Sequence, residues 1–281
     1  MELSAPQLKN YEWWEQNPMT YDWERTLHLQ PGTREWFEEI DHRFLKSAYF
    51  ARSADGNPFG RFLQRNQIAG KKVLEVGCGM GTHASLLARA GADLTAIDLS
   101  DRAVATTRRR FELFGLLGQI EQADAEHLPF DDNSFDVVWS WGVIHHSSRP
   151  EECVAEVARV LRDGARLFLM VYYRPSLVYY LNCGLIRGIF FGQLLRKPLQ
   201  KIYEDSSDGF YARVFNRAEL RELVSPYFRD IELNVVGLKA ELFPIPRTRF
   251  KKMLEQATPD WLASAILNRW GSMIVAEAVR K

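Results

Sequence analysis

The chain has 281 residues, enough for one large α/β domain with additions or for two domains at most. Lys and Arg together number 36, and so do Asp and Glu, so no net field attracts the protein to nucleic acid or to an anionic membrane. Nucleic acid is therefore disfavoured as a substrate or partner. The hydrophobic fraction of 46% is that of a globular protein with a sizeable core.

The cysteines and the N-terminal sequence indicate the cellular compartment in which the protein is expected. Cys78, Cys153 and Cys183 have no metal-ligand spacing, and an odd number does not indicate a disulfide framework. The sequence therefore predicts no metal site. The N-terminus lacks the basic start and apolar middle of a signal peptide. A reducing, cytoplasmic location is expected.

Residues 1–65 are predicted to be helical, and 33–52 is their clearest helix. The region is rich in aromatic residues, including Trp13, Trp14, Trp23 and Trp36. An aromatic extension of this kind looks like a lid that closes over a ligand and excludes water. A helix packed permanently on the core is an equal alternative.

Residues 66–281 alternate strands with helices, which predicts a parallel sheet with right-handed crossovers. Apolar runs predict strands at 72–76, 94–97, 118–122, 135–139 and 166–173. Helices are predicted between them at 82–90, 101–114 and 150–162. A mostly helical insertion at about 175–227 precedes two last strands, at 230–240 and 272–280.

A glycine run follows the first strand directly. Gly77, Gly79 and Gly81 stand where the strand ends and a helix begins at Thr82. Glycine lets a ligand approach the main chain closely, and a helix N-terminus offers unpaired amides. Glycine-rich turns are common, so this pattern alone is a weak signal.

Asp98 strengthens the signal, because it ends the second strand. An acid at that place in a doubly wound sheet can accept hydrogen bonds from both ribose hydroxyls. The alternative is that Asp98 only caps a helix starting near Asp101. The order of strand, turn, helix, strand and acid favours the ribose role, and so a nucleoside-containing ligand.

Glu75 indicates which kind of nucleoside-containing ligand the site would bind. It stands two residues before Gly77, and a carboxylate there would repel a pyrophosphate but suits a ligand with a positive end. The glycine spacing also departs from the dinucleotide pattern G-x-G-x-x-G.

These residues resemble the class I S-adenosylmethionine-dependent methyltransferases, in particular the small-molecule, methyltransferase type 11-like subgroup. The resemblance covers about residues 70–173 and continues through Asp124–Phe130, Ser134–Val138 and Val143–His146. It implies a Rossmann-like, doubly wound sheet of seven strands with the last strand antiparallel. It also implies S-adenosyl-L-methionine as methyl donor and S-adenosyl-L-homocysteine as product.

The resemblance also implies roles for individual residues. Glu75 and the backbone of Gly77, Cys78, Gly79 and Gly81 would line the methionine part of the cofactor. Asp98 would hold the ribose, Leu99 would pack on the adenine, and Asp124 and the Ala125 amide would face the adenine's exocyclic amine and a ring nitrogen. Ser140 or Trp141 would lie near the methionine amino group.

His145 and His146 follow the fourth strand, at the edge where such sheets bind ligands. A neutral imidazole can remove the proton of a hydroxyl or ammonium acceptor. Adjacent residues of an extended segment point opposite ways, and in similar enzymes the first of the pair faces the cleft, so we expect His145 to be the base. The alternatives are that His145 only positions the substrate or that both histidines are structural. His83 is expected to be solvated or to cap its helix.

Tyr172 and Tyr173 end the fifth strand at the same edge. One could hydrogen-bond the acceptor, and at least one is expected to pack in the core.

The acceptor is indicated by the insertion. Residues 176–196 are largely apolar, but Asn182, Arg187 and Gln193 interrupt them, which argues against a transmembrane helix. In similar methyltransferases an insertion after the fifth strand forms the acceptor pocket. An apolar insertion suggests a lipophilic or aromatic acceptor, such as a natural-product, quinone or lipid intermediate. It also suits contact with a membrane surface, or a helix pair buried against the lid or in a dimer.

We expect O-methylation, because a histidine base is present, with N- and C-methylation as alternatives. Two rivals belong to other classes: a nicotinamide-dependent oxidoreductase and a noncatalytic protein that binds the cofactor or a partner. The oxidoreductase would need a glycine placed for a pyrophosphate and a catalytic pair such as Tyr-Lys, and neither is present.

Overall fold

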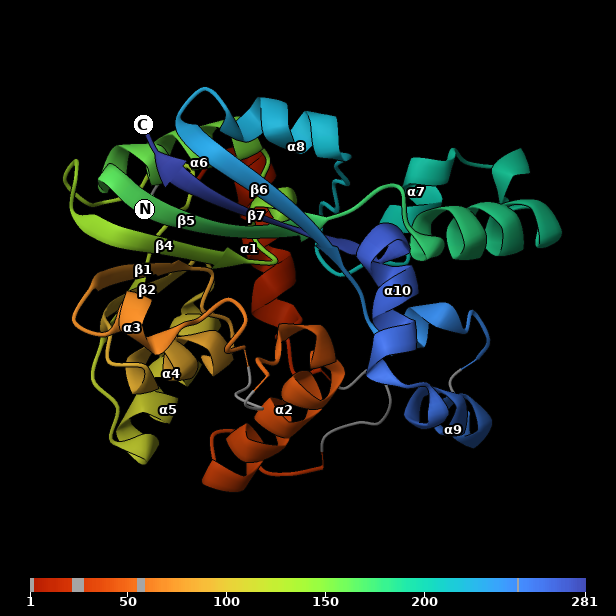
Figure 1. Cartoon of the computed structure of the whole chain (residues 1–281), viewed down its shortest axis with the longest axis horizontal. Helices are drawn as coiled ribbons and strands as arrows, with labels where there is room; N and C mark the ends of the chain where they lie inside the picture. Colours follow the sequence, from red (N-terminus) through yellow and green to blue (C-terminus); the bar gives the residue numbers. More distant parts are fainter. Residues whose placement is uncertain (1–2, 22–27, 55–58, 247) are drawn as a thin grey trace.

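The computed structural model describes residues 3–21, 28–54, 59–246 and 248–281, so Trp23 of the aromatic N-terminal region lies outside it (Figure 1). Seven strands form one sheet in the order β3-β2-β1-β4-β5-β7-β6. β7 runs antiparallel to both of its neighbours, and β1 to β5 are parallel. The predicted fold class is confirmed. The strands are β1 (Lys72–Val76), β2 (Asp93–Asp98), β3 (Gln119–Gln122), β4 (Phe135–Trp141), β5 (Leu161–Tyr172), β6 (Phe228–Val236) and β7 (Met273–Arg280).

Helices cover both faces of the sheet. Successive residues of a strand point to opposite faces, so Val73 joins the hydrophobic cluster under α4 and α5, whereas Leu74 joins the cluster under α6 and α8. Val137 and Val138 of β4 divide in the same way. The sheet therefore lies between two apolar layers. The helices named so far, with the short helix that precedes β1, are α3 (Arg65–Ile68), α4 (Thr82–Arg89), α5 (Asp101–Phe114), α6 (Pro150–Val160) and α8 (Arg217–Val224).

The strand order places a crevice at the carboxyl ends of β1 and β4. The chain leaves β1 toward β2 on one side, and it leaves β4 toward β5 on the other. Ligands of doubly wound sheets bind at such a switch point. The loops after β1, β2 and β4 all open there.

The N-terminal region consists of two helices that are attached in different ways. α2 (Arg34–Ser47) belongs to the core, because Phe37 and Ile40 are fully buried. Arg110 of α5 is buried too, and its guanidinium donates to the Phe37 carbonyl and to Asp41 at 2.8 Å. α1 (Ala5–Gln16) buries only Gln7 and Asn10, both polar. Apolar packing therefore fixes α2, whereas α1 is attached mainly by polar contacts and by an edge contact of the Trp14 ring with His146 at 5.1 Å.

The insertion after β5 is helical, as predicted. It contains a π-helix, η3 (Leu177–Phe190), a short turn, η4 (Gln193–Leu195), and α7 (Leu199–Glu204), before α8. Figure 1 shows η3 and α7 projecting beyond the carboxyl end of β5.

Two more helices follow β6, where the sequence yielded no prediction. They are α9 (Arg249–Ala257) and α10 (Asp260–Trp270), and they extend to the same side of the molecule as η3 (Figure 1). Ala263 and Leu267 anchor α10 in the core. β6 ends at Val236, earlier than predicted, because the chain turns at Gly237. A Cβ on Gly237 would lie 2.7 Å from Gly271 Cα, so the two segments meet closely there.

Candidate active site

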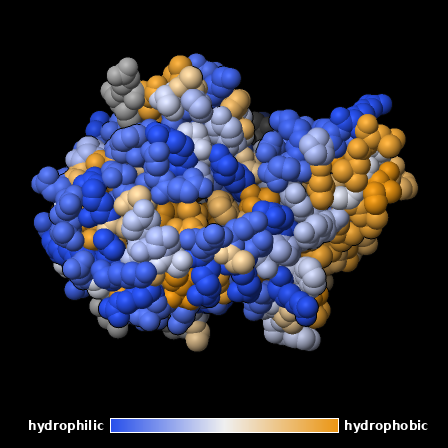
Figure 2. All heavy atoms as spheres, turned by 90° about the horizontal axis from the view of Figure 1, so that it is seen from above, coloured by the Kyte–Doolittle hydropathy of each residue, from blue (hydrophilic) through white to orange (hydrophobic). Residues whose placement is uncertain are grey.

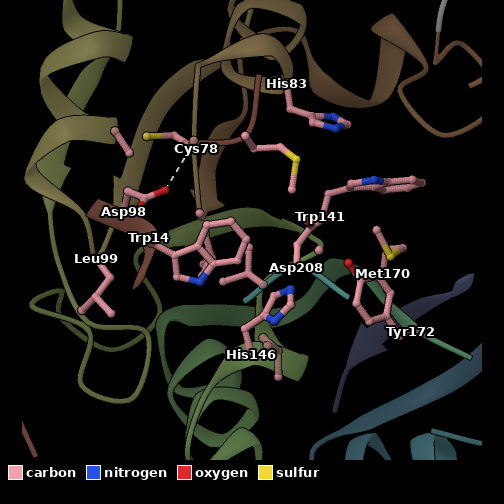
Figure 3. Close-up of a pocket in the computed structure, with 18 of the residues that line it drawn as sticks. Trp14, Cys78, His83, Asp98, Leu99, Trp141, His146, Met170, Tyr172 and Asp208 are labelled. Atoms are coloured by element: carbon pink, nitrogen blue, oxygen red, sulfur yellow. Dashed lines mark hydrogen bonds between the residues drawn. The ribbon is translucent and has the colours of Figure 1, made fainter. Parts of the chain in front are cut away.

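A cavity of about 420 Å³ opens at the carboxyl ends of β1 and β4. Asp98 and Leu99 lie at one end of it, and Met170 and Tyr172 lie at the other (Figure 3). Trp14 and His146 lie between the two ends (Figure 3). The described residues of the wall include three aspartates, at 98, 124 and 208, and neither Lys nor Arg.

The three glycines of the turn differ in what a side chain at each position would contact. All have positive φ, at +83° for Gly77, +52° for Gly79 and +77° for Gly81. A Cβ on Gly77 would meet the Val143 side chain at 2.1 Å, and one on Gly81 would meet Thr107 at 3.0 Å. A Cβ on Gly79 would meet nothing within 4 Å, because Gly79 borders the cavity. Gly77 and Gly81 allow close packing, and Gly79 leaves the main chain open to a ligand.

Asp98 is held at the cavity by backbone amides. Its carboxylate accepts from the amides of Gly79 at 2.8 Å and Ser100 at 3.0 Å. Burial raises the pKa of this carboxyl. The cap of α5 is Ser100, whose hydroxyl accepts from the Ala103 amide at 3.1 Å. The capping role that competed with ribose binding thus belongs to another residue.

Asp124 lies at the same end of the cavity, beside Leu99 and Ala125. Its Oδ1 accepts from the Glu126 amide at 3.0 Å and from Nε2 of Gln7 at 2.8 Å. Gln7 belongs to α1, so the N-terminal helix lies directly over this end. Burial raises the pKa of the Asp124 carboxyl.

Glu75 and Ser140 lie behind the cavity wall rather than in it. The Oε2 atom of Glu75 and the hydroxyl of Ser140 are buried without a hydrogen-bond partner in the described part of the chain. Burial, reinforced by the Asp98 carboxylate, raises the pKa of Glu75 well above its ordinary value. Trp141, the alternative to Ser140, does line the cavity, and its ring stacks on those of Trp139 at 5.6 Å and Phe50 at 6.2 Å.

The histidine pair lies in a 3-10 turn, η2 (Ile144–His146), rather than in an extended segment. The turn directs His146 into the cavity and leaves His145 outside its lining. His145 is fully buried, with its ring centroid 4.0 Å from that of His146 and 3.9 Å from that of Tyr172. Neither of its nitrogens has a partner among the described residues. The structure thus places the second histidine at the cavity, whereas the sequence favoured the first.

A hydrogen bond determines which ring nitrogen of His146 carries the proton. Nδ1 lies in hydrogen-bond contact with the Tyr211 carbonyl, which can only accept, so Nδ1 carries the proton and Nε2 has the lone pair. Burial lowers the pKa of His146 to about 4. The ring is therefore neutral at pH 7. Gly209, with φ +90°, lets the loop close over it, because a Cβ there would lie 2.3 Å from Nδ1.

The insertion supplies residues at this end of the cavity that the sequence did not indicate. Tyr203 lies in the last turn of α7 and Asp208 lies in the loop after it, and both line the cavity with Tyr172. Burial raises the pKa of Tyr172, and the Asp208 carboxylate adds to the effect. Tyr173 points the other way, into the core, so it has the packing role expected for one of the pair. Asp208 escaped notice because only the fold brings it near β5.

His83 is neither solvated nor a cap, so that prediction was wrong. It is buried among aromatic rings, with centroids of Phe44 and Phe59 at 4.9 and 4.8 Å, and its edge lines the cavity. No described residue partners either nitrogen. Burial lowers its pKa to about 3. The first turn of α4 faces Trp139 and Trp141 on β4, which forms this aromatic surrounding.

The buried histidines predict a loss of stability in mild acid. The pKa values of His83 and His146 are about 3 and about 4 in the folded chain, below the ordinary 6.5. As pH falls below about 6.5, the unfolded chain takes up protons that the folded chain does not. The free energy of unfolding should therefore fall between about pH 6.5 and 4, as urea unfolding would measure. In His83→Phe this fall should be smaller, and an unchanged fall would contradict the assignment.

The comparisons with known proteins agree with this geometry. Residues 74–169 match the model of a family described as methyltransferase domain. The chain contains a methyltransferase domain. A phthiotriol/phenolphthiotriol dimycocerosates methyltransferase of Mycobacterium ulcerans is 41% identical over 122 residues, which are 43% of this chain and 44% of that protein.

A second relative is a fatty-acid O-methyltransferase of Mycolicibacterium smegmatis, 44% identical over 110 residues, or 38% of this chain and 39% of that protein. The chain thus spans less than half the length of either relative. The solved structure of a SAM-dependent methyltransferase from Thermotoga maritima matches over 88% of this chain and 94% of that one, with 20% identity and a TM-score of 0.52. That likeness shows the class I methyltransferase fold.

S-adenosylmethionine is the cofactor that the methyltransferase domain implies, and the residues present suit it. It carries a sulfonium and an ammonium, and the described wall has three aspartates without Lys or Arg. The buried Oε2 of Glu75 also lacks a partner behind the glycine turn. A pyrophosphate would meet these carboxylates with no cation on the described wall, so the site does not suit a nicotinamide dinucleotide.

Proposed function

We propose that this protein transfers a methyl group from S-adenosylmethionine to a hydroxyl of a small, partly apolar molecule. The observation that carries the proposal is one continuous cavity with two different ends. Asp98, Asp124 and the glycine turn form a nucleoside-binding end, and Tyr172 lies at the other end, which suits the acceptor. His146 lies between them.

Apolar side chains line much of the acceptor end, among them Phe44, Phe50, Trp141, Met170 and Met273. Such a surface favours a lipophilic or aromatic acceptor over a sugar or a nucleotide. The relative named as a fatty-acid O-methyltransferase supports a lipid-like acceptor and transfer to oxygen.

The chemistry requires alignment and removal of one proton. Bound S-adenosylmethionine supplies a methyl group that is already electrophilic. The cavity walls orient the acceptor, and orientation can contribute about 7 to 11 kcal/mol. His146 Nε2 takes the proton of the acceptor hydroxyl, since the Tyr211 carbonyl fixes the proton on Nδ1. Tyr172 lies where its hydroxyl can hold the acceptor oxygen.

Asp208 favours a second candidate, methyl transfer to nitrogen. It places a carboxylate at the acceptor end of a wall whose described residues include no Lys or Arg. A cationic amine would bind there favourably. The Asp208→Asn variant distinguishes transfer to nitrogen from transfer to oxygen. Its affinity for an amine acceptor should fall, whereas its affinity for a neutral hydroxyl acceptor should not.

Native mass spectrometry of the purified chain tests the proposal directly. The expected result is retained S-adenosylhomocysteine, together with an apolar companion whose mass identifies the acceptor class. Turnover of that companion with labelled S-adenosylmethionine should then yield a methyl ether or ester. Retained nicotinamide dinucleotide would overturn the cofactor, and tight cofactor binding without turnover of any companion would favour a noncatalytic binding protein.

We also propose that α1 is the movable lid and that α2 is not. Gln7 of α1 binds Asp124, and Glu15 accepts from the Ser100 hydroxyl at 2.6 Å and the Arg102 amide at 3.2 Å. When α1 opens, water replaces its polar contacts at little net cost in free energy. Opening α2 would expose its buried apolar face to water, which costs much more. α1 can therefore open and close while the core stays intact.

The lid predicts a kinetic effect. Replacing both Gln7 and Glu15 with alanine should speed cofactor release by roughly ten-fold, because bonds that hold α1 closed are lost. The free energy of unfolding should change little. Stopped-flow fluorescence would measure the release rate. Glu12→Ala, on the exposed face of the same helix, is the control and should leave the rate unchanged. A large loss of stability in the double variant would instead mean that α1 is part of the core.

We also propose that the protein is located in the cytoplasm. All three cysteines are free and buried, which is how a reducing cytoplasm would keep them.

A further inference from the structure

We propose that the projecting helices dock this protein on the surface of an anionic phospholipid bilayer. The contact would be formed by exposed hydrophobic side chains of residues 180–195 and 250–270, which we call the apolar rim. This inference goes beyond the proposed function, because a protein can bind a bilayer whatever reaction it catalyses.

The first observation is where exposed apolar side chains gather. Of 18 large hydrophobic side chains that are exposed in the described chain, 13 belong to the apolar rim. Several are almost fully in solvent: Phe190 is 80% exposed, Leu195 is 91% exposed and Trp261 is 71% exposed. Figure 2 shows a large hydrophobic surface at the end of the molecule where η3 and η4 project. A gathering of exposed apolar side chains of this kind marks an interaction site.

The second observation is local charge. Residues 177–203 contain four cations, at 187, 196, 197 and 201, and no acid, and Glu204 and Asp205 follow directly. Glu204 pairs with Lys201 at 3.7 Å. Asp205 pairs with Lys197 at 2.6 Å and with Lys201 at 3.1 Å. Arg196 and Arg249 are exposed and pair with no carboxylate of the described chain. The rim is thus apolar with a cationic margin, which complements an anionic lipid surface.

The third observation is shape. Figure 1 shows η3 at the tip of a projection, with α9 and α10 forming a second projection on the same side. Aromatic and aliphatic side chains at such tips, flanked by arginines, match the composition of segments that lie in a membrane interface. In the described ranges no helix is long and apolar enough to cross a bilayer. The contact is therefore one of insertion into the surface.

Residues next to the rim in the chain line the cavity. Val178 at the start of η3 lines the acceptor end, and so do Leu238 and Met273, which flank the segment containing α9 and α10. An apolar acceptor dissolved in the bilayer could reach the cavity between the two projections without crossing water. This last step alone rests on the proposed function.

Sedimentation of the full chain with lipid vesicles tests the docking. We expect binding to vesicles of phosphatidylcholine mixed with phosphatidylglycerol, and weaker binding at high salt or to phosphatidylcholine alone. Replacing Phe190 and Phe191 together with serine should weaken partitioning by about ten-fold or more, because two exposed rings no longer insert. Leu117→Ser is the matched control: Leu117 is 87% exposed between α5 and β3, outside the rim, and its loss should change nothing.

Two results would overturn the proposal. One is failure of the unmodified chain to bind the anionic vesicles, and the other is equal binding by the Phe190 and Phe191 double variant. Light scattering on the same proteins shows whether the rim instead joins two copies, since the double variant would then dissociate a dimer that ignores vesicles. Cofactor affinity, measured by calorimetry, should be equal in all variants. A failure of methyl transfer would leave the vesicle result unaffected.

Discussion

Replacing Asp98 with alanine should weaken S-adenosylmethionine binding by about ten-fold or more. The carboxylate lies at the end of the cavity that we propose binds the nucleoside, where two backbone amides orient it. Loss of hydrogen bonds to a charged group costs about 1.5 to 3 kcal/mol, which corresponds to roughly 10- to 150-fold in Kd. Isothermal titration calorimetry would measure the change directly.

The control for this variant lies on the same strand. Asp93→Ala removes an exposed carboxylate at the opposite end of β2 and should leave the Kd unchanged. Asp98→Asn should fall between the wild type and Asp98→Ala, because the amide keeps one acceptor oxygen for the Gly79 or Ser100 amide. Thermal unfolding without cofactor shows whether the fold is intact. Unchanged affinity in a folded Asp98→Ala protein would mean that other groups hold the ribose.

Replacing His146 with glutamine should lower kcat by about 10²- to 10⁴-fold with little change in cofactor affinity. Glutamine can still donate to the Tyr211 carbonyl, but its amide cannot take a proton. The variant therefore removes the base while leaving the loop contact in place. Single-turnover kinetics with a hydroxyl acceptor would measure the effect.

His145→Phe is the matched control, because it keeps a ring between His146 and Tyr172. We expect a much smaller loss of kcat than in His146→Gln. The pH profile adds an independent readout. Only the neutral imidazole accepts a proton, and its pKa is about 4, so kcat should hold from neutral pH and fall as pH drops toward 4. A larger loss in His145→Phe, or a fall centred near 6.5, would point to a different base.

Local patterns predicted much of the fold and the end of the cavity where the glycine turn and Asp98 lie. The strand that ends in Val76, the glycines that follow, and Asp98 at the end of the next strand lie within a few tens of residues of one another. Their arrangement follows from strand period, glycine conformation and the right-handed crossover, all of which are written in adjacent sequence. The wall accordingly contains Gly77, Gly79 and Asp98.

The acceptor end could not be predicted in the same way. Which of His145 and His146 faces the cavity depends on the backbone after β4. An extended segment was assumed there, whereas the chain forms a 3-10 turn. His83 depends on the aromatic rings that α4 happens to face. Asp208 and Trp14 come from elements far away in the chain, so no local spacing connects them to the histidines.

The sequence by itself therefore determined the strands, the glycine turn and the acid that follows it, because each depends on short-range backbone preferences. The antiparallel last strand was implied only by the resemblance to a known family. Only the tertiary structure decided which histidine faces the cavity, that α1 rather than α2 is held by polar contacts, and where the exposed apolar side chains gather. Those outcomes depend on how distant elements pack, and packing is set by contacts that no stretch of sequence contains on its own.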